Sequence, residues 1–273
     1  MRSMREAGLR QCAGALMAAL LWLAAPACAH AAFDPALLQR IDRFVADQVA
    51  ASHIPGVALA VLDDGRVVHS RGFGDDGRGH AVSADTPFPI GSLTKSFTAL
   101  LVRQFIEAGR LDADTPVQRV LPWFKVADAQ ASSRITVRHL LNQTSGFSRA
   151  DGIAPLVAQT QASTMALARA MSSTPLNRPV GASYEYSNLN FVLLGALLEE
   201  LSGRPWPQLV QERVFAPLAL RHSHTDPAQA AGMTALHRYW FGVPLQHGLQ
   251  ALPGMAPAGN LVASANDLAR YAA

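Results

Sequence analysis

The sequence predicts an α+β protein in which an N-terminal helix and one β-hairpin precede a long, mostly helical region. Apolar residues recur at helical spacing in residues 38–49, which predicts an amphipathic helix. Two apolar runs, residues 57–62 and 66–73, flank Asp64-Gly65, a pair typical of tight hairpin turns. From residue 92 onward the apolar pattern is mostly helical again, so helices should outnumber strands.

The first helix should begin at Asp34-Pro35, because aspartate is a common N-cap and proline is favoured at the first helical position. It should end before the turn-forming residues His53–Gly56. Residues 72–85 are polar and rich in glycine, so they predict a loop. The next helix should start at Ser92 and end at Gly109.

Shorter elements follow. Thr136 should cap a short helix within residues 134–146, and Ser264 should cap the last helix. Residues 189–201 are so uniformly apolar that they predict a buried helix ending at Gly203. The other expectations are a surface helix over 161–172, a short helix over 208–215 and a loop over 244–259. A two-stranded hairpin makes a poor sheet by itself, so its edge should need partners that this sequence does not obviously supply.

The composition is that of an ordinary globular protein, and the length suits one large domain or two small ones. No interdomain linker is evident in the sequence, so residues 32–273 are expected to form one domain. The chain has 273 residues, of which 49% are hydrophobic and 16% are charged. Its basic residues are scattered rather than gathered into a stripe, so nucleic acid is not an expected partner.

Residues 1–31 resemble a secretory signal peptide. Arg2, Arg5 and Arg10 precede an apolar core at 13–25, and Ala29-His30-Ala31 offers small residues for cleavage. The core is shorter than the ~20 residues of a membrane span, so no stable span is expected after cleavage. The mature protein should be periplasmic or secreted. Lipid attachment at Cys28 is the weaker alternative, because residues 25–27 fit a lipidation box poorly.

Cleavage after Ala31 would remove Cys12 and Cys28, the only two cysteines of the chain. The mature protein would then have no disulfide and no thiol chemistry.

Ser92 and Lys95 form the first group of residues with chemical potential. Residues three apart lie on the same face of a helix, so the hydroxyl and the amine should lie close together. A buried lysine can act as a base, and a serine beside a base can become a nucleophile. The structural alternative is that Ser92 caps the helix and Lys95 is a solvated residue of its first turn.

Tyr186 and Asn188 form the second group, within Ser183–Asn190. On an extended segment their side chains would face the same way, and a phenol can relay protons while an amide orients a substrate. The alternative is that Asn188 caps the helix that begins at Leu189 while Tyr186 covers its end.

The two groups together resemble the serine β-lactamase and penicillin-binding protein superfamily, whose first signature is serine-x-x-lysine. The chain is most similar to the branch with class C β-lactamases, D-alanyl-D-alanine carboxypeptidases and family VIII esterases, where tyrosine-x-asparagine is the second signature. The resemblance runs from about Asp34 to the C-terminus. Further motifs in the same order are Pro55-Gly56-Val57, Thr86–Gly91, Gly109–Asp112, Ile135–Leu141, Thr144-Ser145-Gly146, Pro217-Leu218 and Pro257–Leu261.

The resemblance implies a β-lactamase/transpeptidase-like fold, with an antiparallel sheet flanked by helices and a helical subdomain. It implies that Ser92 is the acylated nucleophile and that its N–H is half of the oxyanion hole. Lys95 would be the base, Tyr186 would relay the proton to the leaving group, and Asn188 would position the substrate and the Lys95 ammonium. The chain has only two lysines among many arginines, and an arginine could not act as the base at position 95.

The sequence departs from the family pattern in two places. The family usually has histidine where Gln143 precedes the Thr-Ser-Gly turn, and we expect this difference to affect packing more than chemistry. The third signature, Lys/His-x-Gly on a strand beside the site, is not found, since His247-Gly248 lacks the spacing and is not expected to lie on a β-strand. The C-terminal sheet strands are therefore expected to be missing, as in a C-terminally incomplete member of the family.

The resulting hypothesis is an exported serine hydrolase that acts through an acyl-enzyme on an amide, ester or β-lactam carbonyl of a small molecule or peptide. The alternative is a truncated, catalytically impaired remnant or a binding protein with the same fold. No cofactor is implied. His222 and His224 resemble a solvated loop more than a metal site, and no phosphate-binding glycine motif is found.

Overall fold

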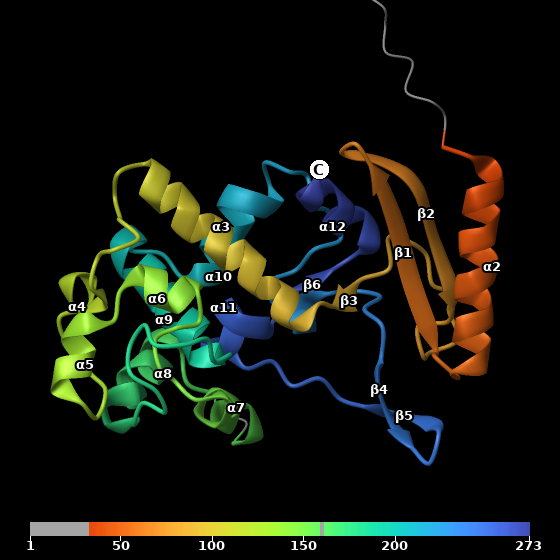
Figure 1. The fold of residues 1–273 in the computed structure, drawn as a ribbon. Helices are drawn as coiled ribbons and strands as arrows, with labels where there is room; N and C mark the ends of the chain where they lie inside the picture. Colours follow the sequence, from red (N-terminus) through yellow and green to blue (C-terminus); the bar gives the residue numbers. More distant parts are fainter. Residues whose placement is uncertain (1–32, 159–160) are drawn as a thin grey trace, which may run out of the picture. The chain divides into compact units, whose positions relative to one another are not determined.

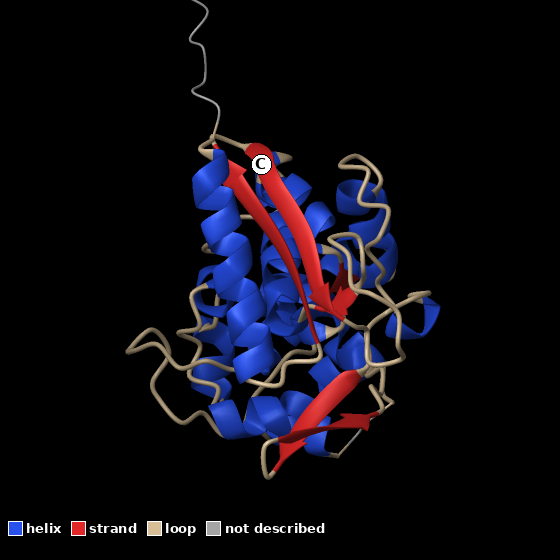
Figure 2. Cartoon of the chain, turned by 90° about the vertical axis from the view of Figure 1, so that its right-hand side faces the viewer, coloured by secondary structure: helices blue, strands red, loops and turns tan. Residues whose placement is uncertain are grey.

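Helices dominate the described chain, and its strands form three separate two-stranded antiparallel sheets (Figures 1 and 2), which confirms the α+β class. The structure is a computed structural model that describes residues 33–158 and 161–273. The predicted signal peptide, residues 1–31 with Cys12 and Cys28, lies outside these residues. Two compact units are distinguished, residues 1–41 and 42–273, and the candidate site lies within the second.

The predicted helices and strands are present in the predicted order, and the structure adds further elements of both kinds. The helices are α2 Pro35–Ala51, α3 Thr94–Glu107, α4 Val117–Val120, α5 Ala129–Arg134, α6 Val137–Leu141, α7 Arg149–Val157, α8 Thr164–Ala170, α9 Asn188–Ser202, α10 Trp206–Val210, α11 Ala256–Gly259 and α12 Ala265–Ala272. The strands are β1 Gly56–Asp63, β2 Arg66–Gly74, β3 Phe88–Pro89, β4 Leu236–Trp240, β5 Val243–His247 and β6 Val262–Ala263. The added elements are helices α4, α5, α7 and α11 and strands β3 to β6.

The predicted hairpin is confirmed as β1 and β2. Val57 lies opposite Phe73, and the turn residues Asp64 and Gly65 have positive φ angles of 47° and 71°, as a tight hairpin turn requires. The C-terminal helix α12 contacts both strands, and its N-cap Ser264 accepts a hydrogen bond from the Asp267 N–H, as predicted. Within the described residues no third strand pairs with this hairpin, so a helix supplies its packing partner.

The short strands β3 and β6 connect the segment before Ser92 with the segment after Pro257. Phe88 pairs with Ala263, Pro89 pairs with Val262, and the Ile90 N–H donates to the Leu261 carbonyl at 2.9 Å. Residues more than 160 positions apart are therefore held together at the start of α3.

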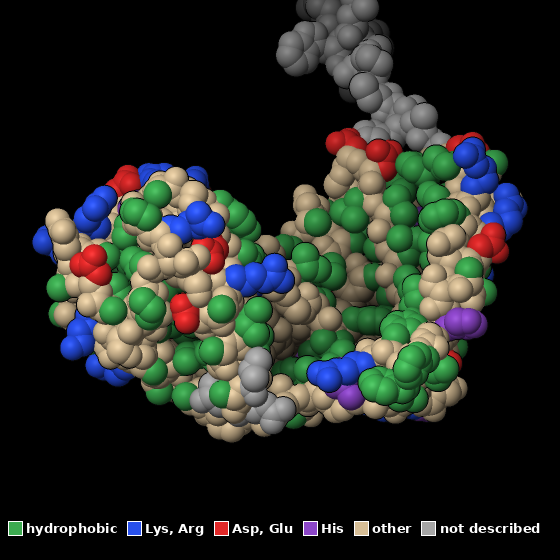
Figure 3. Space-filling view, turned by 60° about the horizontal axis from the view of Figure 1, so that its bottom comes forward, with side chains coloured by type: hydrophobic (Ala, Val, Ile, Leu, Met, Phe, Trp, Pro, Cys, Tyr) green, Lys and Arg blue, Asp and Glu red, His purple; other side chains and the backbone are tan. Residues whose placement is uncertain are grey.

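The predicted loop over 244–259 is wrong in two places. Strands β4 and β5 form a second hairpin, whose turn residues Phe241 and Gly242 have positive φ angles of 48° and 82°. Pro244 disfavours a strand in sequence reasoning, but in a two-stranded sheet each strand has a free edge that tolerates proline. Farther on, residues 256–259 form α11. Hydrophobic side chains gather on the surface over the hairpin (Figure 3), where Trp240 is 66% exposed and Phe241 is 93% exposed.

The helical core is built around α9, which contacts α3, α6, α8 and α11. All residues of α9 from Asn188 to Leu198 are buried, which confirms the predicted buried helix, and Gly203 ends it in the left-handed conformation. Phe97, Leu101 and Phe105 of α3 are also fully or almost fully buried. None of the described helices is both long and apolar enough to span a membrane.

The prediction of a surface helix over 161–172 is only partly right. Helix α8 is shorter than predicted, and its residues Thr164, Leu167 and Ala168 are buried on the side that contacts α9. The exposed side of this helix led to the prediction of a surface helix, although its other side is buried. The short helix predicted over 208–215 is confirmed, with an earlier start, as α10 and a continuing π-turn at Gln211–Phe215.

Candidate active site

Ser92 lies in a single 3-10 turn, Gly91–Leu93, that leads directly into α3. The α-helix therefore begins two residues later than predicted. Gly91 has a φ angle of 50°, which favours glycine at the entrance to this turn. The Ser92 side chain is exposed and does not cap α3, whose N-cap position is Leu93. The reading of Ser92 as a helix cap is therefore wrong, and its hydroxyl is accessible to a substrate.

Lys95 occupies the first turn of α3 and is only 7% exposed. Its Nζ donates to three oxygens: Ser92 Oγ at 3.2 Å, Asn188 Oδ1 at 2.8 Å and the Ala258 carbonyl at 2.7 Å. The alternative of a solvated Lys95 is therefore wrong, because its amine is buried beneath the exposed hydroxyl of Ser92.

Burial lowers the pKa of the Lys95 ammonium below its ordinary value, because the charged form loses its hydration. The nearby Tyr186 hydroxyl opposes this lowering of the Lys95 pKa, because its oxygen favours the ammonium. The rings of Tyr186 and Phe191, with centroids 4.9 Å and 5.6 Å from Nζ, also favour the cation. None of the ion pairs between described residues involves Lys95, so no carboxylate holds it in the charged form.

Tyr186 and Asn188 lie on the same side of an extended segment, as predicted. Ser187 between them has φ −141° and ψ 132°, and the Tyr186 hydroxyl donates to Asn188 Oδ1 at 3.3 Å. The same hydroxyl shares a hydrogen bond with Ser92 Oγ at 2.6 Å. The structure thus brings together all four side chains that the sequence singles out.

Asn188 does not cap α9, so that alternative is wrong. The helix begins at Asn188 itself, with Ser187 at the N-cap position and no capping bond from a side chain. The Asn188 amide instead donates to the Gly152 carbonyl at 2.9 Å while its oxygen accepts from Lys95. A Cβ on Gly152 would lie 2.6 Å from the backbone nitrogen of Asn188, so the close approach of these two segments requires glycine at position 152.

The Ala258 carbonyl is a contact of the site that sequence reasoning missed. Its segment is anchored to α3, because Thr98 Oγ1 donates to the Pro257 carbonyl at 2.8 Å and the Leu261 N–H donates to Thr94 Oγ1 at 3.2 Å. On the other side, Pro257 packs where a Cβ on Gly195 of α9 would lie 2.2 Å from its Cγ. The Pro257–Leu261 motif marked this segment, but a backbone carbonyl has no signature in the sequence.

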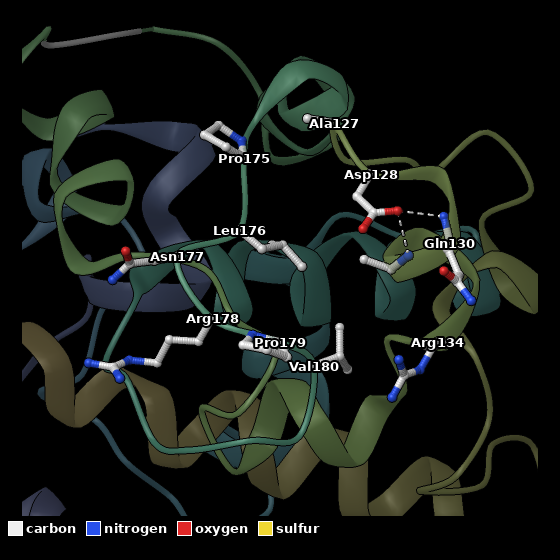
Figure 4. A pocket seen from close by; sticks show the side chains of 11 residues that line it. Ala127, Asp128, Gln130, Arg134, Pro175, Leu176, Asn177, Arg178, Pro179 and Val180 are labelled. Carbon is white, nitrogen blue, oxygen red and sulfur yellow. Dashed lines mark hydrogen bonds between the residues drawn. The ribbon is translucent and has the colours of Figure 1, made fainter.

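The pocket and the histidines described next do not include Ser92, Lys95, Tyr186 or Asn188. The pocket of Figure 4 is lined by residues 127–134 and 175–180, and none of the four candidate side chains belongs to it. The described residues contain no cluster of three or more histidine, cysteine or acidic side chains that could hold a metal ion. The His222 backbone N–H is used structurally, because it donates to Asp267.

Comparisons with known proteins identify the family of the chain. The Beta-lactamase family model matches residues 41–273. Penicillin-binding protein 4 of Amycolatopsis lactamdurans is 34% identical over 229 residues, which cover 81% of this chain and 59% of that relative. The chain thus spans about three fifths of the length of this relative.

Two solved structures have the same fold. The octameric penicillin-binding protein homologue from Pyrococcus abyssi is 26% identical with a TM-score of 0.73, and the match covers 86% of this chain and 55% of that one. EstCE1, a hydrolase with promiscuous acyltransferase activity, is 22% identical with a TM-score of 0.75 over 86% of this chain and 71% of that one. The chain therefore belongs to the beta-lactamase family and has its α+β fold.

Proposed function

We propose that the protein is a serine hydrolase that acts through an acyl-enzyme on an amide, ester or β-lactam carbonyl. One observation carries this proposal: the exposed Ser92 hydroxyl is hydrogen-bonded to both the buried Lys95 amine and the Tyr186 hydroxyl. A nucleophile in contact with a base, and with a second group that can carry a proton, is the arrangement that acyl transfer needs.

In this proposal Lys95 is the base when its amine is neutral. A neutral amine has two hydrogens, and the two shorter contacts of Nζ, to Asn188 Oδ1 and to the Ala258 carbonyl, can accept them. The lone pair then points toward Ser92 Oγ, 3.2 Å away. The Ser92 proton passes to Nζ as Oγ bonds to the substrate carbonyl carbon, and the carbonyl electron pair moves onto its oxygen.

Tyr186 is the proton relay of the proposed reaction. Its hydroxyl lies 2.6 Å from Ser92 Oγ and donates to Asn188 Oδ1, which also accepts from the Lys95 amine. It is therefore placed to give its proton to the leaving group and regain one from the Lys95 ammonium. In deacylation the same hydroxyl would take a proton from the attacking water while it passes its own proton to Ser92 Oγ, 2.6 Å away, as the bond between Oγ and the acyl carbon breaks. The Ser92 N–H, at the N-terminal end of α3, is the proposed donor to the oxyanion.

The substrate class is proposed from the relatives. Penicillin-binding protein 4 and the P. abyssi homologue both have penicillin binding in their names, which supports a penicillin as the first acyl donor to test. We also propose that the protein is exported to the periplasm or secreted. An N-terminus at Ala32 in the mature protein would support the export proposal, and an unprocessed Met1 would contradict it.

The test is covalent labelling of the full chain with a fluorescent penicillin, followed by mass spectrometry of the labelled peptide. We expect an adduct on Ser92 that is lost in Ser92→Ala. Ser96→Ala is a matched control, because Ser96 is also exposed and lies one turn along, where its hydroxyl donates only to the Leu93 carbonyl. A folded chain that binds the penicillin without forming an adduct would favour the alternative, a binding protein of the same fold.

A further inference from the structure

Tyr186 must be held firmly to keep its hydroxyl on Ser92, yet residues 183–187 belong to no helix or strand. The backbone on each side of Tyr186 is held by one residue, Gln143. The Glu185 N–H donates to the Gln143 backbone carbonyl at 2.9 Å, and the Ser187 N–H donates to Gln143 Oε1 at 2.9 Å. Gln143 thus binds the residue before Tyr186 and the residue after it.

The backbone conformation of Gln143 makes this double contact feasible. Its φ angle is 59°, in the left-handed region that a residue with a Cβ rarely adopts. Gln143 follows Asn142, the C-cap of α6, and its left-handed conformation directs its carbonyl and its side chain to the same segment. The unfavourable conformation is consistent with a residue that the surrounding contacts hold in place.

Gln143 is 6% exposed, and its side-chain oxygen Oε1 accepts two hydrogen bonds. Besides Ser187, the Asn190 amide donates to Oε1, and Asn190 Oδ1 in turn accepts from the Ser145 hydroxyl. Both partners of Gln143 Oε1 are donors, so position 143 needs an acceptor there. An apolar side chain of the same size would leave two buried N–H groups unsatisfied.

We propose that Gln143 is a positioning residue that fixes residues 185–187 and thereby holds the Tyr186 hydroxyl against Ser92. Gln143 itself makes no hydrogen bond to Ser92 or Lys95 among the described contacts, so it acts through the backbone on either side of Tyr186. The kinetic part of this inference rests on the proposed hydrolase function. The structural part does not, because the order of residues 185–187 can be measured without a substrate.

The test uses the full chain with two substitutions at this position. Gln143→Met has a similar length but no acceptor, and Gln143→Glu keeps two acceptor oxygens. Gln118→Met is the control, since Gln118 is half-buried and its side-chain amide donates to the Phe124 carbonyl away from the site. The first measurement is hydrogen exchange of a peptide that contains residues 185–190. We expect its amides to exchange at least tenfold faster in Gln143→Met, and within about threefold of wild type in the other two variants.

The second measurement is the rate constant for Ser92 acylation by the fluorescent penicillin. We expect at least a tenfold fall in Gln143→Met with little change in the half-saturating concentration. In a Tyr186→Phe background the same substitution should change the rate less than twofold, because Gln143 acts through the Tyr186 hydroxyl. Unchanged exchange in Gln143→Met overturns the inference, and so does a full additional loss in the double variant. A wild-type chain that is not acylated contradicts the proposed function instead, and hydrogen exchange then still decides whether Gln143 orders the segment.

Discussion

The hydroxyl oxygens of Ser92 and Tyr186 lie 2.6 Å apart although 94 positions separate the two residues in the sequence. Ser92 directly precedes α3 and Tyr186 lies just before α9, and these two helices pack against each other in the core. The apolar packing of α3 on α9 therefore brings their N-terminal ends together at the candidate site. The N-terminal end of a helix has a partial positive charge, which suits a reaction that develops an oxyanion.

Replacing Tyr186 by phenylalanine should remove the relay and leave the ring in place. We expect the acylation rate constant to fall about 10²–10⁴-fold, the usual contribution of a positioned proton-transfer group. Stability should change little, because the hydroxyl is only partly buried. Tyr184→Phe is the control, since Tyr184 lies two residues away and is 66% exposed. Equal rates for the two variants would exclude a role for the Tyr186 hydroxyl.

The four candidate side chains were predictable from sequence because each motif lies at the start of a helix with a clear apolar pattern. Tyr186 and Asn188 mark the entry to α9, and Ser92 and Lys95 mark the entry to α3. The Ala258 carbonyl was not predictable, because any residue has a carbonyl and only the packing of Pro257 on Gly195 directs this one to Lys95.

Gln143 shows a second limit of sequence reasoning. From the sequence we expected this departure from the family pattern to affect packing more than chemistry, and Gln143 is a buried residue. Its main contacts are hydrogen bonds to a segment more than 40 positions away, which no local pattern can show. The β4–β5 hairpin was not predicted for a different reason. Proline at position 244 argues against a strand, but β5 has a free edge on which proline is tolerated.

The acylation rate should depend on pH through Lys95. The neutral amine is the proposed base, so the rate should rise with pH and level off above the pKa of Lys95. Because burial lowers this pKa, the midpoint should lie below the ~10.4 of an ordinary lysine. A midpoint at the ordinary value, or a flat profile, would contradict the assignment. Lys95→Arg should show no such rise and a large loss of rate, since arginine stays charged at all these pH values.

The same pKa shift fixes the sign of the pH dependence of folding. Between the lowered pKa of the folded state and the ordinary pKa of the unfolded state, the unfolded chain binds more protons at residue 95. The free energy of unfolding should therefore rise with pH in this window, relative to a Lys95→Met variant. Urea titrations of both proteins across the window measure the difference.

Gly195→Ala should disturb the site through Pro257, the residue before Ala258, whose carbonyl accepts from Lys95. The new Cβ would lie 2.2 Å from Pro257 Cγ, and the rigid proline ring cannot rotate away. We expect a loss of about 1–3 kcal/mol in the free energy of unfolding, as for other overpacked cores, despite the better helix propensity of alanine. Displacement of Pro257 should also move the Ala258 carbonyl from Lys95 and slow acylation. Gly248→Ala is the control, because a Cβ there meets no atom within 4 Å, and equal effects at both glycines would contradict the steric argument.

Asp267→Ala should destabilise the fold and leave the chemistry of the site intact. The Asp267 carboxylate is fully buried and accepts from the His222 N–H at 2.7 Å, the Ser223 hydroxyl at 2.9 Å and the Arg270 guanidinium at 2.9 Å. These bonds join α12, which covers the β1–β2 hairpin, to the loop at residues 222–223. Removing the carboxylate leaves buried donors unmatched, so we expect a loss of about 2–4 kcal/mol in the free energy of unfolding.

Thermal or urea unfolding of the full chain measures this loss. Asp47→Ala on the exposed side of α2 is the control and should stay within about 0.5 kcal/mol of wild type. Well below its melting temperature the Asp267→Ala variant should still be acylated at Ser92, because Asp267 makes no described contact with the four site residues. Loss of labelling in a demonstrably folded Asp267→Ala protein would mean that α12 supports the site directly, and not only the hairpin that it covers.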